Sequence, residues 1–172
     1  MKFLKMIPII FVFLGLPSYM NLSYAESKNT NDYKVLSNTN KKLSISDVED
    51  YLAEGDNLVN NSDFEKAKQS YDKARNLARQ LAGFYRDLNG SFKGLDARVP
   101  IEMEKKGRES IRIWALSNAR LASFYKRKKQ PEVAVPLLVE IIRLMTPNSP
   151  EGKEAYENLL QLGFVDTVYK GF

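Results

Sequence analysis

Residues 54–78 read EGDNLVNNSDFEKAKQSYDKARNLA, a charged stretch in which small residues recur at regular offsets. Gly55, Ala67 and Ala74 fall among apolar and aromatic residues that repeat every three or four positions. This spacing is typical of amphipathic helices. Glycine and alanine let two helix backbones approach closely, and aromatic side chains such as Tyr71 then fill the spaces beside them. The stretch therefore predicts a closely packed pair of helices.

The ends of this helix pair carry their own signals. Residues 46–49 (SDVE) and 62–65 (SDFE) each place a serine three positions before a glutamate, a pattern that satisfies free amide groups at a helix start. Asn60 and Asn61 lie between the two helices. The second helix is expected to continue for about 25 residues, as far as residues 89–90, where Asn-Gly signals a stop.

Three more helices are expected after a loop at residues 90–99. Pro100 suits the first turn of the next helix, and Gly107 is a candidate break in its middle. No segment alternates as a strand does, so the fold class is all-α. The expected helices span residues 101–128, 131–145 and 149–162, and Gly163 ends the last one.

The loop at residues 90–99 holds two glycines, Gly90 and Gly94, and an apolar pair. Phe92 and Leu95 either pack back on the helices or meet a partner, and packing is the interpretation we favour. Charged residues flank the pair. Asp96 and Arg98 are expected to pair with Arg86 and Asp87.

Two segments resemble tetratricopeptide (TPR) repeats, which are antiparallel helix pairs of 34 residues. Residues 48–81 match the small and large positions of the repeat, and residues 115–148 match again 67 positions later, within one residue of two periods. The second copy departs from the pattern at Asn118 and Ile141. The resemblance implies an α-solenoid type of fold with long irregular central helices and a C-terminal capping helix.

Four parts of the chain differ in composition. The first 25 residues carry Lys2 and Lys5 before a short apolar run, which predicts an export signal, with a retained membrane anchor as the alternative. Polar residues then dominate a predicted disordered linker. The expected division is a signal peptide at 1–25, a linker at 26–44, a helical domain at 45–165 and a tail at 166–172.

Composition excludes several kinds of chemistry. The chain has no cysteine and no histidine, which excludes disulfides, thiolate nucleophiles and histidine-based catalysis. Its net charge of +5 falls to +3 without Lys2 and Lys5, so nucleic-acid binding is not expected. Glu102 with Glu104, and Asp47 with Glu49, point to different sides of a helix. We therefore expect no enzyme activity, cofactor or metal, and keep a carboxylate-based envelope hydrolase only as a remote alternative.

The resemblance also implies where a partner would bind. In TPR arrays the first helix of each pair lines a concave face, which places Leu52, Val59, Leu116 and Ala119 beside it and makes the polar neighbours binding candidates. A solvated face without a role is the alternative. The candidate binding residues are Glu49, Asp56 and Asn60 in the first repeat, and Ser123, Lys126 and Arg127 in the second.

Charge within this set has two consequences. Asp56 would repel a peptide's terminal carboxylate, so capture of that group is not expected. The basic run at residues 126–129 fits a helix C-terminus, with anionic lipid as the alternative ligand.

The order of these features resembles a family of small exported TPR proteins in cyanobacteria and plant plastids. That resemblance implies a place in the periplasm or the thylakoid lumen and a scaffold or assembly role, with a link to photosynthetic membrane complexes. The expected partner is a protein or peptide. Peripheral membrane association and the oligomeric state stay open. The alternative is a structural or self-associating module whose groove is filled by the C-terminal helix or a second copy.

Overall fold

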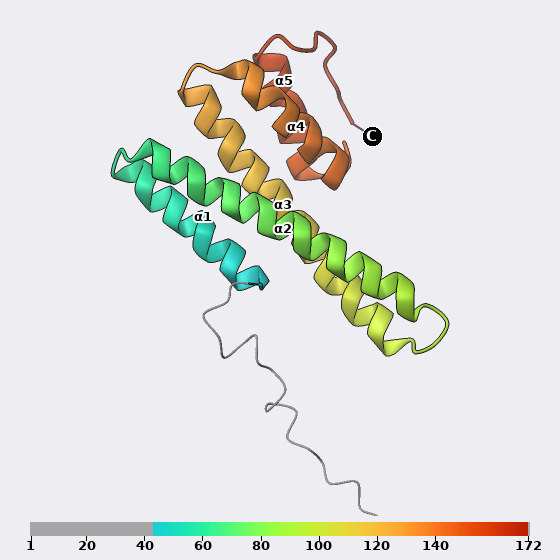
Figure 1. The fold of residues 1–172 in the computed structure, drawn as a ribbon. Helices are drawn as coiled ribbons and strands as arrows, with labels where there is room; N and C mark the ends of the chain where they lie inside the picture. Colours follow the sequence, from blue (N-terminus) through green and yellow to red (C-terminus); the bar gives the residue numbers. More distant parts are fainter. Residues whose placement is uncertain (1–42, 172) are drawn as a thin grey trace, which may run out of the picture.

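The computed structural model describes residues 43–171, and every regular element in that part of the chain is a helix (Figure 1). The prediction of an all-α fold is confirmed. The expected signal peptide and nearly all of the expected linker lie outside the described residues. The helices are α1 (Ile45–Asn60), α2 (Phe64–Phe92), α3 (Arg98–Arg127), α4 (Pro131–Met145) and α5 (Pro150–Gln161).

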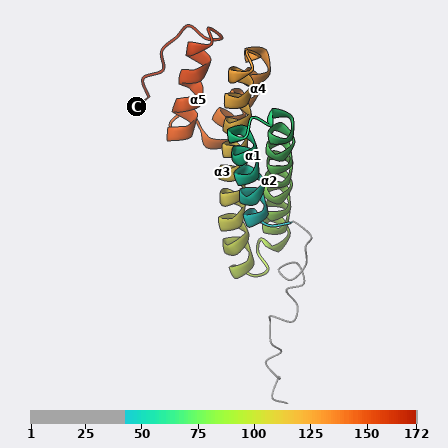
Figure 2. The ribbon, with the colours of Figure 1, turned by 90° about the vertical axis from the view of Figure 1, so that its left-hand side faces the viewer.

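Each helix packs on the one before it in the chain. The two central helices are the longest, at 29 and 30 residues, whereas α1 has 16. At about 1.5 Å per residue, α2 is therefore roughly 20 Å longer than α1. Figures 1 and 2 show α2 and α3 running side by side past the start of α1, with α4 and α5 stacked at the other end of the molecule.

The small residues pack as the sequence predicts. Gly55 is buried, and a Cβ atom built on it would lie 2.4 Å from Cε1 of Tyr71, closer than real Cβ contacts allow. The Tyr71 ring is 1% exposed and fills the space that the glycine leaves. The alanines at the matching positions, Ala67, Ala74, Ala122 and Ala134, are also buried. Close helix approach therefore depends on the absence of side-chain volume at these sites.

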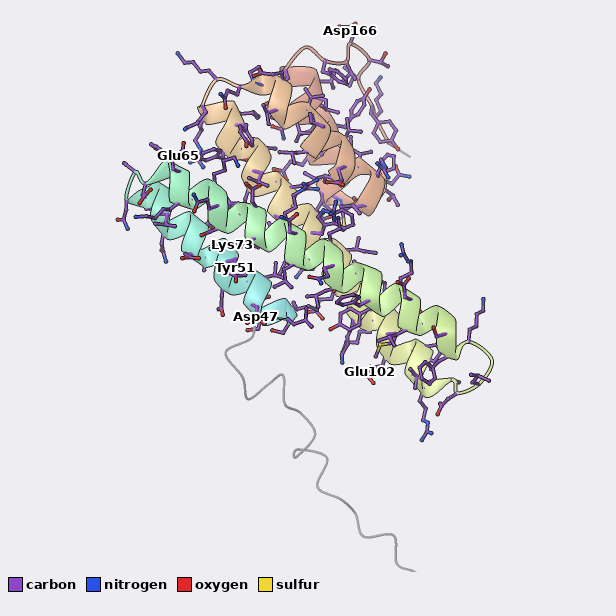
Figure 3. All side chains as sticks on the ribbon, viewed as in Figure 1. Asp47, Tyr51, Glu65, Lys73, Glu102 and Asp166 are labelled. Atoms are coloured by element: carbon purple, nitrogen blue, oxygen red, sulfur yellow. The ribbon has the colours of Figure 1, made fainter. Side chains whose placement is uncertain are left out.

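On the outer side of the α1–α2 pair, the Lys73 Nζ atom lies over the ring of Tyr51, 5.7 Å from its centroid (Figure 3). A cation near an aromatic face is attracted to it. This contact lies outside the apolar contacts that α1 and α2 make with each other.

Asn118, which departs from the repeat pattern, is fully buried in a polar network. Arg75 Nε on α2 donates to its Oδ1 at 2.6 Å, and its Nδ2 donates to Glu140 Oε2 on α4 at 2.9 Å. Arg75 Nη2 also donates to Glu140, at 2.6 Å. A large apolar side chain at position 118 could not satisfy these groups, so the departure has a structural reason.

The predicted helix starts are wrong by one or two residues. Ser44, not Ser46, caps α1, since its Oγ accepts from the Asp47 amide at 3.2 Å. Asp63, not Ser62, caps α2. Ser62 has a φ of +61°, a left-handed conformation, whereas an N-cap residue has extended backbone. Leu43, near the end of the expected linker, is partly buried and packs against the core.

Two predicted helix breaks are absent. The α2 helix continues through residues 89–90 to Phe92, and Asn89 Nδ2 instead donates to the Pro100 carbonyl of α3 at 3.1 Å. The α3 helix passes Gly107 without interruption. Packing between the two long helices outweighs the weak local preference of glycine for a break.

The loop prediction is also wrong. Leu95 is 81% exposed and Phe92 is 38% exposed, so the apolar pair does not pack back as a unit. The ion pairs form between neighbours: Asp96 pairs with Arg98 at 2.8 Å, and Arg86 pairs with Asp87 at 3.1 Å. Pairs so close in sequence cost less ordering than pairs between segments.

The described part of the tail lies against α5. The Tyr156 hydroxyl donates to the Thr167 carbonyl at 2.7 Å, and the rings of Tyr156 and Tyr169 meet edge to face at 5.8 Å. Gly163, with a φ of +70°, turns the chain after α5 as predicted. Of the helices in residues 43–171, none has both the length and the apolar character needed to cross a membrane.

We predict that Gly55→Ala destabilises the fold. The added methyl group must displace the buried Tyr71 ring, so the free energy of unfolding should fall by about 1–3 kcal/mol. Denaturant unfolding measures this value. Gly107→Ala is the matched control, because its Cβ would lie 3.7 Å from the Tyr85 Cβ, an ordinary contact. Equal stability of the two variants would contradict the role given to Gly55.

Candidate functional site: a groove along α3

A pocket lies between α1 and α3, and five of the six predicted binding residues line it. Val59, Tyr71 and Arg120 complete its lining. Glu49 is exposed on α1 outside this pocket, and Leu52, expected beside the face, is buried. The five predicted residues that meet here are Asp56, Asn60, Ser123, Lys126 and Arg127.

Asp56 is held from two sides in this pocket. Its Oδ1 accepts from the Tyr71 hydroxyl at 2.6 Å and pairs with Arg120 Nε at 3.1 Å. The expected repulsion of a carboxylate by Asp56 is therefore offset by Arg120. Lys126 and Arg127 lie beside this pair, so cations outnumber acids in the lining of the pocket.

Tyr71 connects the core to the pocket. Its ring is buried between α1 and α2, while its hydroxyl reaches Asp56. Burial of the phenol raises the pKa of Tyr71 well above its ordinary value of 10.0, and the hydrogen bond to Asp56 raises it further. The phenol therefore stays protonated and acts as a fixed donor to the carboxylate.

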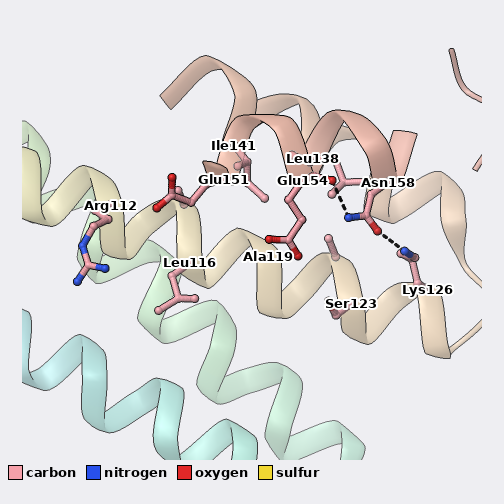
Figure 4. A pocket seen from close by; sticks show the side chains of 13 residues that line it. Arg112, Leu116, Ala119, Ser123, Lys126, Leu138, Ile141, Glu151, Glu154 and Asn158 are labelled. Atoms are coloured by element: carbon pink, nitrogen blue, oxygen red, sulfur yellow. Dashed lines mark hydrogen bonds between the residues drawn. The ribbon is translucent and has the colours of Figure 1, made fainter. Parts of the chain in front are cut away.

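A second pocket lies between α3 and α5, over α4 (Figure 4). Its floor is apolar and includes Leu116, Ala119 and Ile141. The cavity measures about 140 Å³, below the roughly 300–1,000 Å³ of small-molecule clefts. Its size suits an inserted side chain better than a whole cofactor.

The two pockets share Ser123 and Lys126, so they adjoin along α3, and we call the two together the groove. Lys126 Nζ donates to Asn158, which ties α3 to α5, one wall of the groove (Figure 4). The groove is positive at its α1 end and mixed at its α5 end. There the lining includes Glu151 and Glu154 of α5 and Arg112 of α3 (Figure 4).

The C-terminal helix forms a wall of this groove. Its side chains line the second pocket, while the pocket between α1 and α3 contains none of them. The arrangement leaves an open surface on α3 between α1 and α5.

Sequence reasoning missed two groups of groove residues. Arg120 lies four positions after Leu116, on the same face of α3, so helical spacing could have found it. Tyr71 was assigned to packing alone, and its hydroxyl gave no local signal. The α5 residues could not be found, because nothing in the sequence tells on which side of α3 this helix lies.

The carboxylate pairs do not converge. Glu102 pairs with Lys106 at 2.6 Å, and Glu104 pairs with Arg108, each one turn further along α3. In residues 43–171 no group of three acidic side chains is placed to hold a metal ion.

The basic run at residues 126–129 is divided between contacts. Lys126 bonds to Asn158, while Lys128 pairs with Glu65 at 3.1 Å and lies over the Phe124 ring. Arg127 lies between these two lysines, since it lines one pocket with Lys126 and another with Lys128.

The Tyr71 hydrogen bond predicts a dependence of stability on pH. The unfolded phenol ionises near pH 10, whereas the folded one resists ionisation, so the unfolded state loses protons first and the free energy of unfolding falls as the pH rises above about 10. Tyr71→Phe should remove this loss and cost about 1 kcal/mol at neutral pH. Unfolding curves of both proteins between pH 7 and 11 measure the difference. Parallel pH profiles would contradict the assignment.

Comparison of the chain with protein-family models, with curated proteins and with solved structures found no match. The functional argument therefore rests on the groove itself.

Proposed function

We propose that this chain is a non-catalytic protein-interaction module of the TPR type, which binds a peptide segment of another protein in the groove along α3. One observation carries the proposal: polar candidates chosen from two distant segments line one pocket, and that pocket continues into an apolar one. A groove with both a charged and an apolar part offers orientation and affinity to a peptide.

The dimensions of the groove favour a short segment. From Arg112 to Arg127 the lining follows about four turns of α3, roughly 22 Å at 1.5 Å per residue. An extended peptide spans this length with about seven residues. We expect a small apolar side chain at Leu116 and Ala119, and an acidic side chain near Lys126 and Arg127.

The cellular place is part of the same proposal. A leader-like sequence at residues 1–25 supports export to a periplasm or a thylakoid lumen. The resemblance to exported TPR proteins of cyanobacteria and plastids supports an assembly role near photosynthetic membrane complexes. A partner protein in that compartment would supply the segment.

The test is selection of peptides from a displayed library on the immobilised chain, followed by titration of the selected peptides. Leu116→Glu should raise the Kd at least tenfold, about 1.4 kcal/mol, because it puts a charge into the apolar pocket. Leu116 is 40% exposed, so the fold should tolerate the change. Arg127→Ala should remove the preference for acidic residues.

Val139→Glu is the matched control. Val139 is 37% exposed on α4 and lies outside the groove, so its variant should bind like the wild type. Selected peptides that bind Leu116→Glu as tightly as the wild type would overturn the proposed site. A failure to select any peptide would favour the structural, self-associating alternative.

A further inference from the structure

The α2–α3 hairpin extends past α1 and forms an arm, which we define as residues 82–108 (Figures 1 and 2). The pairing of residues between α1 and α2 shows where α1 stops covering α2. Tyr71 donates to Asp56, whereas Lys73, later on α2, contacts Tyr51, earlier on α1, so the helices run antiparallel. Continuing this register brings Ile45, the first residue of α1, beside residues 79–82. Beyond that level α1 does not cover α2.

The apolar face of α2 continues past the end of its cover. Leu77 and Leu81 are buried at 8% and 2% exposure. The next residues along that face, Phe84 and Leu88, are 44% and 43% exposed, and Phe92 is 38% exposed. We call these three residues the arm stripe. Within residues 43–171, a face that is buried in its first half is therefore exposed in its second half.

Gly83 and Gly90 lie on the side of α2 away from the stripe, because at about 100° per residue they are turned roughly 140–160° from Leu88. A Cβ on either would meet nothing within 4 Å, so both positions are open in one copy. They serve as reference sites outside the stripe.

Most charges of the arm are paired within it. Arg86 pairs with Asp87, Arg98 with Asp96, Lys106 with Glu102 and Arg108 with Glu104. Lys93 and Lys105 stand outside these pairs, so the arm has six basic and four acidic residues, a net charge of +2. Two such surfaces therefore repel each other only weakly.

We infer that two copies of this chain associate through the arm, with α2 of one copy packed on α2 of the other across a two-fold axis. A two-fold interface must be complementary to itself. The arm stripe meets this condition, because Phe84, Leu88 and Phe92 follow one face of a single helix and an antiparallel copy presents the same apolar row. Two antiparallel hairpins then make a four-helix bundle.

The exposed apolar area fits such an interface. The stripe and Leu95 together expose roughly 400 Å² per copy, taking full side-chain areas near 150–250 Å². Each partner of a standard interface buries about 800 Å², a little over half of it apolar. The groove uses residues 112–127 of α3, outside the arm, so the dimer and peptide binding are independent proposals.

The first test is the mass of the protein in solution over a concentration series, using light scattering after size exclusion. We expect a dimer for the wild type. Leu88→Glu should raise the dimer Kd at least tenfold while the unfolding transition stays cooperative, because this side chain is already half-exposed in one copy. Val139→Glu, matched in exposure, should leave the Kd unchanged.

Gly83→Leu is a second control, on the same helix but away from the stripe. In one copy the new side chain meets open space and favours the helix, so the monomer should unfold at the same or higher denaturant concentration. The dimer Kd should stay unchanged. A dimer that tolerates Leu88→Glu, or one that is lost in Gly83→Leu or Val139→Glu, would overturn the arm interface.

Cross-linking locates the contact, since the chain has no cysteine of its own. Asp87→Cys lies next to Leu88 of the stripe in sequence, and a short thiol-specific cross-linker should join two copies there. Glu132→Cys, on α4, should not be joined. A protein that stays monomeric at every concentration would overturn the proposal. This holds whichever other occupant is then found to cover the stripe: a vesicle, another protein or residues 33–36 of the same chain.

Discussion

The contact between Gly55 and the Tyr71 ring is the constraint on which the rest of the structure depends. The ring occupies the volume that a side chain at position 55 would fill, and this sets how closely α1 approaches α2. Buried alanines repeat the same device between the later helices. Since close packing tolerates little change in volume, these small residues determine the spacing of the whole layer.

The same contact builds the polar end of the groove. Because the ring is fixed against Gly55, its hydroxyl is held in place to donate to Asp56, and Asp56 in turn pairs with Arg120. A core residue thus orients a surface carboxylate on α1 toward a cation on α3. Packing and site geometry are therefore linked through one side chain, and the groove is as rigid as the helix pair beneath it.

Asn118 has a comparable role on the other side of α3. It is buried, yet both ends of its amide are hydrogen-bonded, to Arg75 on α2 and Glu140 on α4. Buried polar groups cost stability unless they are satisfied, so this network favours one arrangement of three helices over shifted ones. Together with the Tyr71 contact it holds α3, the helix that lines the whole groove.

The sequence by itself determined the all-α class, the approximate limits of most helices and the buried small residues. It also pointed to five of the six candidate residues that line the pocket between α1 and α3. These features depend on spacing along a helix, which is local information. The helix starts were misassigned, because Ser62 lies in a left-handed conformation that composition does not reveal. The loop around Leu95 was misassigned as well, since burial depends on which elements surround a residue.

Only the tertiary structure decided the rest. It brought α5 to one wall of the groove, gave Asp56 its partners and left the end of the α2–α3 hairpin without cover. Each of these depends on how far one helix extends relative to another and on which side its neighbour lies. A helical pattern states which face of a helix is apolar, but it does not state what covers that face.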